Sequence, residues 1–114
     1  MDMDAHGCPC LALGPLPGTF DETYLGQDLT EGRYGDVSIR ACRVCGRRWL
    51  RYFVEYEAFT ASGRWYTGLL PEGAEAGLTP ERAAPLLESL PWHVHGGSYF
   101  GHAGRRGSGR LHLR

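Results

Sequence analysis

Two pairs of closely spaced cysteines constrain the fold of this chain more than any other feature. Cys8 and Cys10 flank a single proline, and Cys42 and Cys45 enclose two residues at the start of the stretch CRVCGRRWL. Four thiolates supplied as two pairs, each from a tight turn, are a common donor set for tetrahedral zinc. A fold that uses such a site must bring the N-terminal turn against the segment that begins at Cys42.

The size of the chain makes such a site useful for stability. A chain of 114 residues most often forms one domain with a modest core. Its first residues, MDMDAHG, are acidic and polar, and no apolar run approaches the ~20 residues of a membrane helix. We therefore expect a cytoplasmic protein, in which metal ligands or redox thiols are favoured over disulfides. The expected organisation is one zinc-stabilised domain over residues 1–104 and a mobile basic tail over 105–114.

The second cysteine pair resembles the knuckle of a zinc ribbon or treble clef. In that motif Cys-x-x-Cys-Gly is followed by basic and aromatic residues and leads into a strand, and Cys42, Cys45 and Gly46 match it. The glycine permits the positive φ with which backbone N–H groups point at sulfur. Together with the first pair, the spacing predicts structural Zn²⁺. The ligand set is Cys8, Cys10, Cys42 and Cys45.

Two alternatives to this ligand set stay open. The thiols could serve in redox chemistry or as reduced core residues, because arginines beside a CxxC pair lower the thiol pKa. The redox interpretation is weakened because Cys42 and Cys45 precede an expected strand, whereas a thioredoxin-like pair begins a helix. His6 is an alternative fourth ligand if one of the N-terminal cysteines does not reach the metal.

The remaining pattern predicts a small α+β fold, an antiparallel sheet that carries the zinc-knuckle pair and one helix in the C-terminal half. Residues 11–36 are dense in glycine, proline and acids and predict irregular chain. Residues 49–70 predict a β-hairpin, because apolar and polar residues alternate on both sides of the turn TASG.

Residues 79–90 carry the signals of the helix. Thr79 is a suitable N-cap and Pro80 suits the first helical position, so the helix should end by Leu90. Pro85 should kink the helix or confine its regular part. Beyond it the chain is rich in glycine, and we expect loop apart from a short strand at 98–100.

Charge is distributed in blocks along the chain. The net charge is -1, yet residues 37–54 carry five arginines and no acid, whereas residues 1–36 carry seven acids and one arginine. Guanidinium groups and aromatic rings together favour a surface for nucleic acid or for a protein partner. Its candidate residues are Arg40, Arg43, Arg47, Arg48, Trp49 and Arg51. Alternatively, the acids of the first block fold over this surface and neutralise it.

Three histidines near the C-terminus form an alternative metal site. His93 and His95 are two residues apart, so on a strand both rings point to the same side, and His102 follows. No carboxylate follows Ser89 to orient a histidine ligand or to act as a base, which favours histidines without a metal.

Function follows from these patterns only in outline. No catalytic triad, paired carboxylates or cofactor fingerprint stands out, so the sequence does not predict an enzyme. We expect a bacterial-type, non-catalytic zinc-binding module that binds another protein as an adaptor, an inhibitor or an immunity partner. The alternatives are nucleic-acid binding through the arginine block and a metalloenzyme built on the three histidines.

Overall fold

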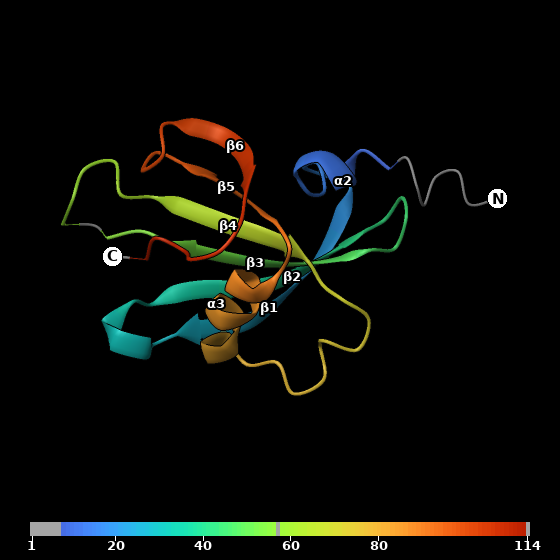
Figure 1. The fold of residues 1–114 in the computed structure, drawn as a ribbon, viewed down its shortest axis with the longest axis horizontal. Coiled ribbons are helices and arrows are strands. Elements are labelled where there is room, and N and C mark those ends of the chain that lie inside the picture. The colour runs from blue at the N-terminus through green and yellow to red at the C-terminus, as the bar shows by residue number, and fades with distance from the viewer. Residues whose placement is uncertain (1–7, 57, 114) are drawn as a thin grey trace.

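The protein is built on one antiparallel sheet of six strands in the order β1-β2-β3-β4-β5-β6 (Figure 1). The computed structural model describes residues 8–56 and 58–113. The strands are β1 (Phe20–Asp28), β2 (Gly35–Cys42), β3 (Arg48–Val54), β4 (Arg64–Leu69), β5 (His93–Gly97) and β6 (His102–Gly107). The helices described are α2 (Cys10–Leu13), the 3-10 turn η1 (Thr30–Gly32) and α3 (Pro80–Ser89). The fold is therefore mixed α+β, and the sheet dominates it.

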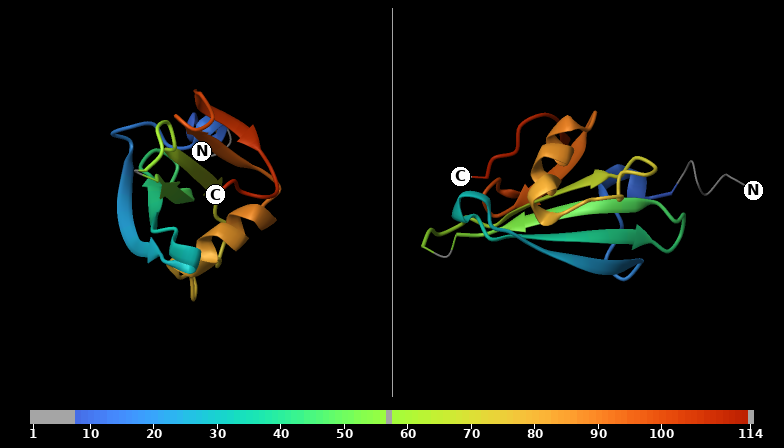
Figure 2. Two further views of the ribbon diagram at one scale, coloured as in Figure 1. Left: turned by 90° about the vertical axis from the view of Figure 1, so that its left-hand side faces the viewer. Right: turned by 90° about the horizontal axis from the view of Figure 1, so that it is seen from below.

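The sheet is curled, and α3 packs against its first four strands (Figure 2). Because each strand pairs with its neighbour in the sequence, all connections between paired strands cross one of two ends of the sheet. The β2–β3 turn and the long β4–β5 connection lie at one end, and the β1–β2, β3–β4 and β5–β6 connections lie at the other. We call the end with the β2–β3 turn the cysteine end and the opposite end the loop end.

The main core lies between one face of the sheet and α3. Leu50, Tyr52 and Val54 alternate along β3 and are buried, in agreement with the period of two in the sequence. Gly68 lets α3 approach β4, because a Cβ at this position would lie 2.8 Å from Leu87 Cδ2. The other buried members of this core are Val37, Ile39, Tyr66, Ala83, Ala84, Leu90, Leu111 and Leu113.

The predicted hairpin and helix are both confirmed. β3 and β4 pair antiparallel within residues 48–69, with Trp49 opposite Leu69 and Val54 opposite Arg64. Helix α3 starts after Thr79, which is extended, and stops before Leu90. It continues through Pro85, so its regular part is not confined to the residues after this proline. Within the described residues no helix has the length and apolar character needed to cross a lipid bilayer.

Strands also occur where irregular chain is expected. Residues 20–28 form β1, whose alternation is interrupted by a bulge between Tyr24 and Gly26 and whose outer positions carry acids. Residues 98–100 form the turn between β5 and β6 and not a strand. Gly96 of β5 allows the Trp65 side chain of β4 to pack closely, because a Cβ at position 96 would lie 2.7 Å from Trp65 Cζ2.

The segment expected as a mobile tail is packed on the core. Residues 105–107 belong to β6, and Leu111 and Leu113 are buried. The Tyr66 hydroxyl donates to the His112 carbonyl oxygen at 2.9 Å and accepts from the His112 N–H at 2.8 Å. The apolar residues at 111 and 113 therefore outweigh the glycines and arginines around them.

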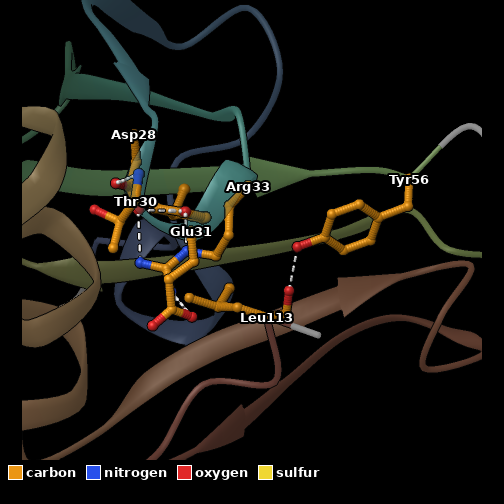
Figure 3. Close-up of polar contacts among 7 residues, drawn as sticks. Asp28, Thr30, Glu31, Arg33, Tyr56 and Leu113 are labelled. Atoms are coloured by element: carbon orange, nitrogen blue, oxygen red, sulfur yellow. Dashed lines mark hydrogen bonds and ion pairs between the residues drawn. The ribbon is translucent and has the colours of Figure 1, made fainter.

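A buried carboxylate fixes the end of β1 to β3. Asp28 is fully buried and accepts hydrogen bonds from the Thr30 N–H at 3.0 Å and Arg33 Nη2 at 2.9 Å (Figure 3). It also accepts one from the Tyr52 hydroxyl at 2.6 Å. Burial by itself would raise the pKa of Asp28, but these donors lower it to about 2. Gly35 makes room for the network, because a Cβ there would overlap the Tyr52 ring at Cζ.

We expect Asp28→Asn to lower the free energy of unfolding by about 3 kcal/mol at neutral pH, because the amide cannot accept all three bonds and leaves Arg33 without its charge partner. Urea unfolding measures this loss. The control is Asp21→Asn in the same strand, which alters an exposed ion pair with Arg43 and should cost less than about 1 kcal/mol.

The same pair of proteins tests the charge of Asp28. Because its pKa is lowered, its stabilisation is complete above the unfolded value of about 3.9 and is lost as the pH falls through about 2. The difference in unfolding free energy between wild type and Asp28→Asn should therefore be constant down to about pH 4 and shrink below it. A difference that stays constant to about pH 2 would contradict this role.

Candidate metal centre

The four cysteines meet at the cysteine end of the sheet. Cys8 precedes α2 and Cys10 begins it, whereas Cys42 ends β2 and Cys45 lies in the turn before β3. Figure 1 shows α2 beside the sheet, with the chain from α2 leading into β1. Two segments about 35 residues apart in the chain are thus brought together through their thiols.

The distances between the sulfur atoms match a tetrahedral metal site. Cys8 Sγ lies 3.7 Å from Cys42 Sγ, and Cys10 Sγ lies 3.5 Å from Cys45 Sγ. All four sulfurs lie within 4.8 Å of one another. Zinc at about 2.3 Å from four tetrahedral sulfurs holds them about 3.8 Å apart, whereas a disulfide needs about 2.05 Å. The four thiols, which are free, therefore have the spacing of metal ligands.

The backbone of the β2–β3 turn explains how the second pair is aimed. The Gly46 N–H donates to the Cys42 carbonyl oxygen at 2.8 Å, and the Cys42 N–H donates to the Arg47 carbonyl oxygen at 2.8 Å. Gly46 has φ +81, and a Cβ added to it would meet nothing within 4 Å, so its role is conformational. The glycine of the predicted knuckle is thus required by the turn.

Side chains from distant strands hold the N-terminal half of the site. Arg106 of β6 donates to the carbonyl oxygens of Leu11 and Ala12, and its guanidinium carbon lies 3.9 Å from the centre of the Trp92 ring. Trp92 in turn meets Trp49 edge-on, with ring centres 5.9 Å apart. No local pattern in the sequence indicates these contacts, because Arg106 and α2 are more than 90 residues apart.

Arg47 supplies positive charge to the thiols. Burial opposes ionisation of Cys45, but hydrogen bonds from the backbone and side chain of Arg47 lower its pKa to about 6. Burial and the neighbouring thiols raise the pKa of Cys10. The site therefore combines a thiol that ionises more easily, Cys45, with a buried thiol, Cys10, whose ionisation a bound cation would favour.

The cysteine cluster is almost fully buried. Cys8, Cys10 and Cys42 are at most 5% exposed, and Trp49 is fully buried beside them. Four sulfur donors leave no open coordination position for water or substrate, which is typical of structural sites. His6, the alternative fourth ligand, lies outside the described residues. Within the described residues these four cysteines are the one group of three or more metal-ligating side chains whose ligand atoms converge.

The other residues of the candidate partner surface have different surroundings. Arg40 pairs with Glu22 at 3.3 Å, Arg43 with Asp21 at 2.9 Å and Arg48 with Glu75 at 2.6 Å. Burial and the charge of Arg40 lower the pKa of Arg51 to about 10. Trp49 has no exposed face for stacking a base. Two acids of the first block thus pair with arginines of the basic block, as the alternative interpretation expects, and Glu75 of the β4–β5 connection pairs with a third arginine.

The three histidines pack as aromatic rings. His95 stacks on Phe100 with ring centres 4.5 Å apart, and the centres of His95 and His102 are 5.0 Å apart. His93 Nε2 lies 3.3 Å from the Gly109 carbonyl oxygen. Burial lowers the pKa of both His93 and His95. Within the described residues their nitrogens do not form a convergent ligand set, so the structure lends the histidine metal site no support.

Comparison with known proteins identifies no relative. No family model matches the chain, and no curated protein or solved structure is significantly similar to it. The function must therefore be argued from the site and the surface themselves.

The role of Arg47 gives a test of the electrostatics. We expect Arg47→Ala to weaken zinc binding by about tenfold or more, because the loss of the side-chain hydrogen bond to Cys45 and of its positive charge makes the thiol harder to ionise, while the backbone N–H stays. Competition with a chromophoric chelator at several pH values measures the affinity. The control Arg43→Ala, whose side chain pairs with Asp21, should leave it unchanged. Equal losses in both variants would contradict a specific role for Arg47.

Proposed function

We propose that the protein is a non-catalytic, cytoplasmic module that is stabilised by structural zinc and binds another protein. The proposal of structural zinc rests on the convergence of four cysteine sulfurs within 4.8 Å of one another. A sulfur-only donor set favours zinc over magnesium or calcium, which prefer oxygen. When bound, the metal would supply a cross-link between α2 and the β2–β3 turn. The closed donor set and the absence of an enzyme motif in the sequence favour a structural role.

The cross-link would complete the second core of the protein. Cys8, Cys10, Cys42 and Trp49 form a buried cluster against which Leu69 and Trp92 pack. In the same region Gly14 lies over β4, since a Cβ there would be 3.2 Å from Thr67 Cγ2. The N-terminal segment therefore covers part of the face of the sheet that α3 leaves open, around Trp49 and Thr67, and the thiols hold it there.

The loop end supports the partner half of the proposal. Large apolar side chains are exposed on its three connections: Leu29 is 55% exposed, Tyr34 61%, Phe59 69% and Tyr99 43%. Aromatic residues are enriched where proteins bind one another. Loops held by a rigid scaffold are also the usual place for recognition. The presence of these exposed apolar side chains on all three connections of one end favours a protein partner at the loop end over nucleic acid at the ion-paired arginine block.

The metal half is tested by elemental analysis and X-ray absorption of the purified protein. We expect one zinc per chain with four sulfur ligands, and loss of both metal and fold in Cys42→Ser or on chelation. Val44→Ser changes an exposed residue of the same turn and should keep both. A metal-free protein that stays folded, or coordination by nitrogen, would refute the structural zinc site.

The partner half is tested by affinity purification followed by mass spectrometry. We expect one protein to be retained by wild type and lost, with at least about a tenfold drop in recovery, from a variant with Leu29→Ser and Tyr34→Ser. The control, Leu16→Ser with Val44→Ser, removes exposed apolar residues outside the loop end and should retain it. Recovery of nucleic acid that falls steeply with salt would instead support the arginine block.

A further inference from the structure

A cavity of about 570 Å³ opens at the loop end, between the β3–β4 connection and the β5–β6 turn. Its walls include Tyr56, Phe59, Ser62, Arg64 and Tyr99. A volume of this size is typical of sites that enclose small organic molecules, and such sites combine apolar walls with a few polar groups. The polar group of interest here is Arg64.

Within residues 8–56 and 58–113, Arg64 is a buried cation without a matching anion. The residue is 2% exposed, and its Nε is buried with no hydrogen-bond partner. Among the described residues, no carboxylate forms an ion pair with it. Its guanidinium carbon lies 4.0 Å from the ring centre of Tyr99 and 5.3 Å from that of Tyr56. The two rings offset part of the free energy of hydration that the guanidinium group loses. An unpaired buried charge is still unfavourable, and a bound anion would stabilise it.

The walls are fixed by hydrogen bonds before any ligand arrives. Ser62 Oγ donates to the Tyr56 carbonyl oxygen at 2.7 Å and accepts from the Tyr56 N–H at 3.0 Å. The Tyr99 N–H donates to the Gly63 carbonyl oxygen at 2.9 Å, next to Arg64 in the chain. Two walls are thus tied to the strand that carries the arginine, so a ligand would find the site preorganised.

Two other polar side chains in the walls of the cavity have partners of their own. The Tyr56 hydroxyl donates to the Leu113 carbonyl oxygen (Figure 3). Glu31 also lines the cavity, and its Oε1 lies 3.9 Å from Arg33 Nη1. One cation and one acid in the walls favour a ligand with a single compact anionic group over a highly charged one.

We propose that this cavity binds a small organic anion, whose carboxylate or phosphate group pairs with Arg64 while its aromatic or apolar body lies against Tyr99, Tyr56 and Phe59. The planar guanidinium fork matches both kinds of anion in geometry. The three rings match a flat or apolar body. This inference goes beyond the proposed function, because it needs neither zinc nor a protein partner to be correct.

The test is a titration of the isotopically labelled, purified protein followed by nuclear magnetic resonance. The probes are phenylacetate, phenyl phosphate and the uncharged 2-phenylethanol. We expect saturable shifts of the Arg64 Nε–H and of the backbone amides of Ser62 and Tyr99 with at least one anionic probe, and at least about tenfold weaker binding of the alcohol. The preferred anion identifies the ligand as a carboxylate or a phosphate. Absence of saturable shifts, or equal affinity for all three probes, would overturn the proposal.

Variants then assign the effect to the cavity. Arg64→Gln should weaken the better anionic probe by about tenfold or more. Arg48→Gln, at the opposite end of β3 and exposed, should bind as wild type does. Phe59→Ala changes a ring that is 69% exposed, so it should fold normally and weaken binding about threefold. Unchanged affinity in Phe59→Ala together with Arg64→Gln, or in Phe59→Ala alone if Arg64→Gln is unfolded, would overturn the assignment.

Discussion

The contact between two distant pairs of thiols is the constraint on which the rest of the structure depends. The sheet has two faces that need cover, and one helix covers only one of them. Segment 8–18 is too short and too rich in glycine and proline to hold itself against the other face. Four sulfurs converging at one point replace the apolar area that a longer helix would bury, which is how small domains commonly use a metal. Trp49 is buried because of this arrangement.

Arginine illustrates how the same residue type takes on different roles in different surroundings. Arg47 faces sulfur, Arg106 binds the carbonyl oxygens that end α2, and Arg64 is enclosed between tyrosine rings. Arg43 and Arg48 instead form exposed ion pairs, which contribute little to stability. Charge counted along the chain treats all of these alike. Only the three-dimensional neighbours distinguish a side chain that supports a site from one that is merely solvated.

The parts of the fold that the sequence predicts are those with strong local signals. The hairpin over 49–70 alternates cleanly, and Thr79 with Pro80 marks the start of α3, so neither depends on distant partners. The strands over 20–28 and 93–107 were hidden because bulges and glycines break their alternation, and tertiary contact decides them. The cysteine set was predictable from spacing, although the arginine and tryptophan that support it were not. The cavity could not be foreseen, because its walls come from three separate connections.

The order of the strands separates the cysteine cluster from the loops that carry the proposed binding surface. In an antiparallel meander, alternate connections lie at opposite ends of the sheet, so the thiols of the β2–β3 turn cannot lie beside the β1–β2, β3–β4 or β5–β6 connections. The cysteine end therefore constrains the strands without occupying the surface on which the loops lie. Changes in the exposed residues of the loops would then leave the cysteine cluster in place. Asp28 and Arg33 also hold the fold at the loop end, so the proposed binding surface there is confined to the exposed side chains of the connections, which can vary without disturbing the buried network.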